Sequence, residues 1–209
     1  MAANTWDRIR YKAFGWRTEL SVAKKLALAL GMALATGLLA QARIALPFTP
    51  VPLTGQTFGV LLAGVLLGQW WGGISMLLYV ALGIAGVPLF TGWGSGLAWL
   101  AGPTGGYLIG FVLAALLIGF VTDRFVKARQ FPAMLGLFLA ADFLVVYIPG
   151  LAGLYLWSNV LSNHHATLLA VLTMGAVPFF IGDAIKAVAA AATASAITPK
   201  TAYGKRRSD

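Results

Sequence analysis

The sequence contains no cysteine and few acidic residues. Its 209 residues include 6 Asp or Glu against 15 Lys or Arg. The absence of cysteine excludes disulfide bonds, thiol catalysis and thiolate metal sites. No G-x-x-x-x-G-K-[ST] nucleotide loop, H-E-x-x-H motif or paired-carboxylate arrangement occurs either. His164 and His165 are adjacent, which is not a metal-site spacing and predicts solvated loop residues. We therefore expect no catalytic residue, no metal and no cofactor.

Charge is scarce and apolar residues are abundant. Only 10% of the residues are charged and 59% are hydrophobic, whereas soluble domains carry about 25% charged residues. The chain is long enough for about six spans of roughly 20 residues. We expect an all-α integral membrane protein with six transmembrane helices.

The net charge of +9 is concentrated in three places. Lys and Arg cluster before Leu26, within residues 124–129, and from residue 200 onward. This distribution is the positive-inside pattern of membrane proteins rather than a nucleic-acid footprint. It predicts a multi-pass protein of the cell membrane, with both termini cytoplasmic.

The predicted order along the chain is a basic amphipathic segment, a membrane domain and a basic tail, at residues 1–21, 22–198 and 199–209. The predicted spans are residues 22–45, 58–71, 74–90, 105–121, 133–157 and 181–197, with a tight turn at 72–73. Residues 167–176 are apolar but short, and Pro178 follows them, so we expect a short interfacial or re-entrant helix there.

Asp183 and Lys186 are the only charged residues between Thr167 and Pro199. Their spacing of three places both on one face of a helix. Ionisable groups inside a membrane segment cost roughly 2.5–3.5 kcal/mol each, so they are seldom retained without a partner or a function. This pair is the leading candidate for a binding site, and the alternative is a structural ion pair that neutralises itself.

Further polar groups are predicted at the outer ends of the spans. Three prolines in residues 46–57 prevent regular helix, so this segment faces a cavity or is buried in protein. Thr54 and Gln56 there offer hydrogen bonds to a ligand or to neighbouring backbone. Gly92 and Ser95 belong to a glycine-rich loop that suits a lid over a pocket, or is an ordinary flexible loop.

The predicted fourth span starts near Thr104, Gly105 and Tyr107. Its N-terminus points outward, as does that of the last span. Helix N-termini favour anions, so these two ends, together with Lys186, could receive a carboxylate. Asp183 could instead accept hydrogen bonds from ligand N–H groups or hold Lys186 in place. Tyr147, in the fifth span, is expected to line the same cavity.

Small residues recur at a spacing of four. Gly106 and Gly110 are expected to bring helices of the bundle into close contact. For Ala29, Ala33 and Gly37 in the first span, contact with an external partner helix competes with internal packing.

Seven stretches of the sequence, taken together, form a recognisable set of motifs: residues 44–47 (IALP), 50–56 (PVPLTGQ), 78–83 (LYVALG), 86–90 (GVPLF), 101–111 (AGPTGGYLIGF), 178–179 (PF) and 182–186 (GDAIK). This set resembles the motifs of the BioY family, the biotin-binding S components of energy-coupling factor (ECF) transporters. The resemblance covers most of residues 22–197, and Arg43 departs from the uncharged residue expected at its position.

The resemblance implies a six-helix component that binds biotin from outside, with Asp183 and Lys186 in the pocket. It also implies contributions from the loop after the third span and from residues 102–106. The implied partners are a transmembrane coupling subunit and two ATPases, with Ala29, Ala33 and Gly37 as candidate contacts. Two alternatives remain open: an S component for another vitamin, and an ion-coupled carrier that uses Asp183 and Lys186 as a proton relay.

Overall fold

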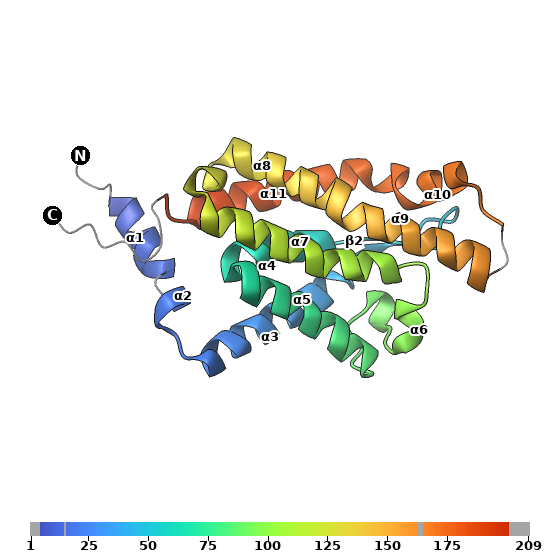
Figure 1. The fold of residues 1–209 in the computed structure, drawn as a ribbon, viewed down its shortest axis with the longest axis horizontal. Helices are drawn as coiled ribbons and strands as arrows, with labels where there is room; N and C mark the ends of the chain where they lie inside the picture. Colours follow the sequence, from blue (N-terminus) through green and yellow to red (C-terminus); the bar gives the residue numbers. More distant parts are fainter. Residues whose placement is uncertain (1–4, 15, 163–164, 201–209) are drawn as a thin grey trace.

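The computed structural model describes residues 5–14, 16–162 and 165–200. Most of these residues are helical (Figure 1), and η denotes short 3₁₀ or π segments. The elements are α1 (Thr5–Phe14), α2 (Trp16–Glu19), α3 (Val22–Leu39), β1 (Arg43–Ile44), β2 (Leu53–Thr54), α4 (Gln56–Leu67), α5 (Gln69–Ile84), η1 (Thr91–Trp93), α6 (Leu97–Leu100), α7 (Gly105–Arg124), η2 (Val126–Arg129), α8 (Phe131–Ala140), η3 (Ala141–Val146), α9 (Tyr147–Leu156), η4 (Trp157–Leu161), α10 (Leu168–Gly175), η5 (Val177–Phe179) and α11 (Phe180–Ile197).

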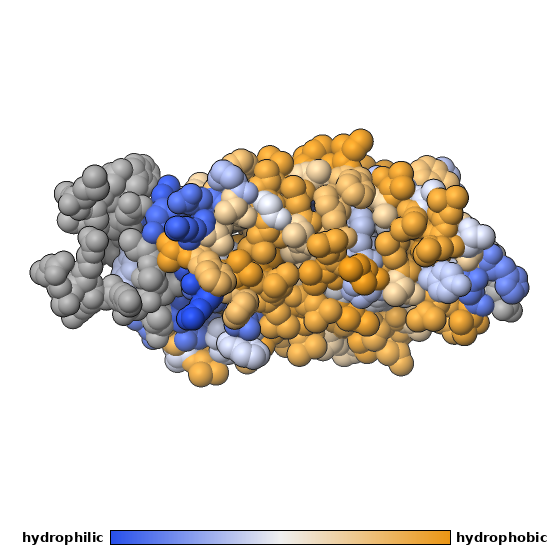
Figure 2. Space-filling model, turned by 45° about the horizontal axis from the view of Figure 1, so that its top comes forward, coloured by the Kyte–Doolittle hydropathy of each residue, from blue (hydrophilic) through white to orange (hydrophobic). Residues whose placement is uncertain are grey.

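Four helical segments of the described chain are long and apolar enough to cross a membrane: Val22–Leu39, Gly105–Arg124, Phe131–Leu161 and Leu168–Ile197. The helices α4 and α5 are apolar but shorter. On the face shown in Figure 2, apolar side chains form a broad band across the middle of the molecule, with polar residues toward both ends. The structure is therefore that of a mostly helical membrane protein.

The central helix of the bundle is α7. It packs against α4 and α5 on one side and against α9 and η3 on the other, while α11 lies against α4 and α8 (Figure 1). This arrangement brings residues from the first, middle and last thirds of the chain to one place.

The first predicted span ends earlier than expected. Its helix stops at Leu39, and β1 pairs with β2 in an antiparallel two-stranded sheet, with Arg43 opposite Thr54 and Ile44 opposite Leu53. The prolines between the strands prevent helix, as expected, but the strand pairing was not predicted. This pairing holds together the two ends of the proline-rich loop.

The predicted turn at residues 72–73 is wrong. The chain turns at Gly68, whose φ of +83° is a left-handed conformation that glycine adopts without strain. Gly72 instead lies inside α5, where an added Cβ would come within 2.8 Å of the Ala63 carbonyl oxygen. Three glycines, Gly68, Gly72 and Gly73, lie close together in the sequence. Because Gly72 packs against α4, the turn forms at Gly68.

The second half of the bundle follows the prediction more closely. Helix continues from Phe131 to Leu161 through two π segments, over the predicted fifth span. The short apolar helix predicted at 167–176 is α10, and α11 begins at Phe180 after the interruption at Pro178.

Glycines bring α7 close to α9 and η3, which is the internal bundle packing expected for Gly106 and Gly110. An added Cβ at Gly106 would clash with the Pro149 carbonyl and lie 3.0 Å from Gly150 Cα. At Gly110 it would lie 2.7 Å from Val146 Cα. These positions pack the bundle internally.

The small residues of α3 are buried within this chain. Ala29 and Ala33 have 0% exposure, and Gly37 lies against Leu89. Ser75 of α5 donates a 2.8 Å hydrogen bond to the Ala29 carbonyl. In this arrangement the small residues support packing of α3 on α5, and the surface of α3 is a row of exposed leucines instead: Leu26, Leu30, Leu34 and Leu38.

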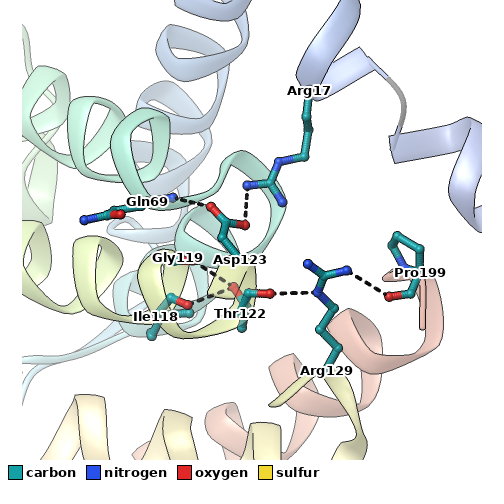
Figure 3. A network of polar contacts seen from close by, with 8 residues as sticks. All are labelled: Arg17, Gln69, Ile118, Gly119, Thr122, Asp123, Arg129 and Pro199. Atoms are coloured by element: carbon teal, nitrogen blue, oxygen red, sulfur yellow. Dashed lines mark hydrogen bonds and ion pairs between the residues drawn. The ribbon is translucent and has the colours of Figure 1, made fainter. Parts of the chain in front are cut away.

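A polar network joins several segments at the end of the bundle where α2 lies (Figure 3). Arg17 forms a 2.8 Å ion pair with Asp123, whose other oxygen accepts a 3.0 Å hydrogen bond from the Gln69 backbone N–H. Arg129 donates to the carbonyl oxygens of Thr122 and Pro199, at 2.7 and 3.2 Å. The network ties α2, the α4–α5 turn, α7 and the chain after α11 together.

We expect Asp123→Ala to destabilise the fold by about 1–2 kcal/mol, because it removes a partly exposed ion pair and the acceptor at the start of α5. A lowered melting temperature in detergent checks this. Asp123→Asn retains an oxygen for the Gln69 N–H, so this variant should lose less stability than Asp123→Ala. Equal melting temperatures for Asp123→Ala and the wild type would contradict the prediction.

Candidate functional site

A cavity of about 60 Å³ lies among β2, α4, α7, α9 and α11; we call it the inner cavity. It contains most of the predicted polar site residues. Its lining residues are Val51, Pro52, Leu53, Thr54, Gln56, Thr57, Phe90, Thr91, Trp99, Thr104, Tyr107, Leu108, Phe111, Val146, Tyr147, Phe179, Asp183 and Lys186.

Asp183 is the buried acceptor at the centre of the site, with 3% exposure. Tyr147 donates a 2.5 Å hydrogen bond to its Oδ2, and Thr57 donates a 3.2 Å hydrogen bond to its Oδ1. Lys186 forms an ion pair with the same Oδ1. Both carboxylate oxygens are therefore held in place by groups from α4, α9 and α11.

Lys186 bridges two elements. Besides its ion pair with Asp183, its Nζ donates a 2.7 Å hydrogen bond to the Thr54 carbonyl in β2. An ammonium group has three donors, so one donor remains for a ligand. Because Asp183 already compensates its charge, Lys186 can offer this hydrogen bond without an uncompensated buried charge.

Gln56 organises the polar wall next to this pair. Thr54 and Thr91 donate to its Oε1 at 2.7 and 3.4 Å, and its Nε2 donates to the Tyr79 hydroxyl at 2.6 Å. Gln56 thus fixes β2, η1 and α5 relative to one another.

Aromatic rings form the other walls. Phe90 and Trp99 lie 6.1 Å apart, between ring centroids, and Tyr107 packs edge-on to Tyr147 at 6.3 Å. The Tyr107 hydroxyl donates a 2.7 Å hydrogen bond to the Gly175 carbonyl, so its ring rather than its hydroxyl is available to the cavity. Trp99, which follows the glycine-rich loop, is thus a wall residue as well.

Of the predicted site residues, the structure brings together Thr54, Gln56, Thr104, Tyr107, Tyr147, Asp183 and Lys186. Gly92, Ser95 and Gly105 are not among the residues that line the inner cavity. Gly92 lies instead against the Arg43 guanidinium, and Gly105 against the Leu100 carbonyl. Their part in binding stays a prediction.

Several wall residues were not predicted, including Thr91, Phe111 and Phe179. They lie far apart in the sequence, and none interrupts an apolar stretch as Asp183 does. Phe111 and Phe179 fall within the motif stretches 101–111 and 178–179, but the motifs alone do not mark them as wall residues. Thr91 lies in η1, outside those stretches, and the fold brings all three to one cavity.

Within residues 5–14, 16–162 and 165–200, no group of three or more His, Cys, Asp or Glu could hold a metal ion. His165 is described, whereas His164 lies outside the described residues. The arrangement is suited to binding a small molecule with an apolar body and a few polar atoms.

Comparison with known proteins gives a consistent result. The model of the BioY family matches residues 11–203. A protein of Methanothermobacter thermautotrophicus named "Probable biotin transporter BioY" is 49% identical over 144 residues, which is 69% of this chain and 92% of the relative. The "Biotin transporter BioY" of Rhizobium etli is 36% identical over 156 residues, covering 74% of this chain and 81% of the relative.

A solved structure has a similar fold. It is the crystal structure of the S-component for biotin from an ECF-type ABC transporter. The similarity has a TM-score of 0.75 at 29% identity and covers 87% of this chain and 94% of the other.

Proposed function

The chain belongs to the BioY family, and from that premise we propose that it is the biotin-binding S component of an ECF-type transporter. This family consists of transport components, so the chain is a transport protein and not an enzyme. The observation that carries the proposal is the Asp183–Lys186 pair, held by Thr57 and Tyr147 beside an aromatic-walled cavity.

The chemistry of biotin matches the polar and apolar groups of the site. Its ureido group presents N–H donors and a carbonyl acceptor, and Asp183 with the remaining donor of Lys186 complements them. Its fused rings and aliphatic chain are apolar and suit the walls formed by Phe90, Trp99 and Phe179. Binding in this form needs no cofactor.

The proposed membrane arrangement is six spans with both ends in the cytoplasm of the cell. The α2 helix and the C-terminal end of α11 lie at the same end of the bundle (Figure 1). Arg17, Arg129 and Lys200 gather there, as the positive-inside rule predicts for a cytoplasmic surface. The cavity then opens toward the outside.

The proposed partners are a transmembrane coupling subunit and two ATPases, which supply the energy for uptake. The exposed leucine row of α3 offers an apolar surface for a helix of the coupling subunit, and Ala29, Ala33 and Gly37 lie beneath it. The partners would account for transport by a chain that has no nucleotide-binding motif of its own.

Uptake measurements separate this function from its alternatives. In cells that also contain the coupling subunit and ATPases, labelled biotin should accumulate, and excess riboflavin or thiamine should not compete. Dissipating the proton gradient while ATP is maintained should leave uptake unchanged. Competition by another vitamin would identify a different substrate, and loss of uptake with the gradient would indicate an ion-coupled carrier.

A further inference from the structure

A second cavity adjoins the inner one on its outer side. This outer cavity has a volume of about 360 Å³. Pro52, Thr91, Trp99 and Thr104 line both cavities, so these four residues form a neck between them. Pockets for drug-sized ligands typically measure about 300–1,000 Å³. The inner cavity alone, at about 60 Å³, is smaller than this, and a ligand such as biotin requires part of the outer cavity as well.

Arg43 is the cationic residue that lines the outer cavity. Its side chain is exposed, and among the described residues it has no hydrogen-bond or ion-pair partner. Its guanidinium lies over Gly92, where an added Cβ would approach Arg43 Nη1 to 2.5 Å. The glycine therefore leaves room for the guanidinium at the cavity.

Arg43 and Lys186 are both next to Thr54 of β2. Arg43 is paired with Thr54 in the β1–β2 register, and the Thr54 carbonyl accepts the hydrogen bond of Lys186. Lys186 therefore lines the inner cavity and Arg43 lines the outer cavity, with the neck between them.

The two cations differ in their charge balance. Lys186 is already paired with Asp183, so a carboxylate brought beside it would leave a net negative charge in a buried site, at a high desolvation cost. Arg43 has no such compensating group, and its planar guanidinium can bind a carboxylate through two hydrogen bonds. An anionic group is therefore favoured at Arg43 and disfavoured at Asp183–Lys186.

We propose that Arg43 receives the carboxylate of the ligand in the outer cavity, which orients biotin with its ureido group toward Asp183 and Lys186. The aliphatic chain then passes through the neck between Pro52 and Trp99. This inference rests on the proposed function, and it assigns the two ends of the ligand to the two cavities.

The test compares biotin with biotin methyl ester, whose tail is uncharged, on the full chain in neutral detergent. Arg43→Gln should weaken biotin binding by about fivefold, the range of a partly exposed ion pair. Its affinity for the methyl ester should stay within about twofold of the wild type, since no charge is lost from that contact. Arg43→Lys should recover part of the biotin affinity. The matched control is Arg124→Gln, the same substitution on another exposed arginine. Arg124 is the last residue of α7, whereas Thr104, which lines both cavities, is at the start of that helix. This variant should change neither affinity.

Raising the salt concentration adds an independent measurement. Biotin affinity of the wild type should fall with salt, and this dependence should be reduced in Arg43→Gln because screening acts on the ion pair. Unchanged biotin affinity in Arg43→Gln, or an equal loss for both ligands, would overturn the inference. Unchanged affinity is also the result expected if Arg43 serves lipid headgroups instead. If the wild type binds neither ligand, the proposed function itself fails.

Discussion

Asp183→Asn should weaken biotin binding at least tenfold, or by about 1.4 kcal/mol. The substitution preserves size but removes the charge that Lys186 pairs with. It also replaces one acceptor oxygen by a donor, so Thr57 and Tyr147 cannot both keep their hydrogen bonds to the two ends of this side chain. The measurement is the equilibrium dissociation constant of labelled biotin with the purified variant.

A matched control comes from the other end of the bundle. Asp123→Asn also removes the carboxylate of an ion pair, but it lies outside both cavities. It should therefore reduce stability without changing biotin affinity. Wild-type affinity in a folded Asp183→Asn variant would remove Asp183 from the site.

Lys186→Ala tests the other residue of the same ion pair. It leaves the Asp183 carboxylate buried without its cation, which is costly for the protein, and it removes the donor proposed for the ureido carbonyl. We expect a loss of at least tenfold here as well.

Gly106→Ala should destabilise the protein by more than about 2 kcal/mol, toward the upper part of the range for overpacked interiors. The added methyl group would meet the backbone of Pro149 and Gly150 in α9, and backbone cannot rotate away as a side chain does. The helices α7 and α9 would have to separate. Tyr107 and Tyr147 lie on these helices and line the inner cavity, so biotin binding should fall with stability.

Gly136→Ala is the corresponding control. Gly136 is an exposed helical glycine of α8, and nothing lies within 4 Å of an added Cβ. Alanine is favoured over glycine in a helix by about 0.5–1 kcal/mol, so this variant should be as stable as the wild type or more stable. Comparable melting temperatures for the two variants would contradict the close contact at Gly106.

The centre of the site could be predicted from the sequence because it breaks the surrounding pattern. Asp183 and Lys186 interrupt an apolar stretch, and charges are expensive in a membrane. Their positions three residues apart predicted the ion pair that the structure shows. Tyr147 was identified by its depth in a span, and it contacts Asp183 directly.

What could not be predicted depends on long-range packing. The turn occurs at Gly68 rather than at the neighbouring glycines because α4 and α5 pack through Gly72. The strand pair at Arg43 is two residues long, too short to leave a period in the sequence. The outer cavity depends on that pair, so the position of Arg43 opposite Thr54 emerges only from the fold.

Equilibrium binding of labelled biotin to the detergent-purified chain tests the central claim most directly, with excess unlabelled biotin, riboflavin and thiamine as competitors. We expect binding in the nanomolar range, displaced by biotin and not by the other two vitamins. Failure of a well-folded chain to bind biotin, or equal displacement by riboflavin or thiamine, would contradict the proposal that this chain itself recognises biotin.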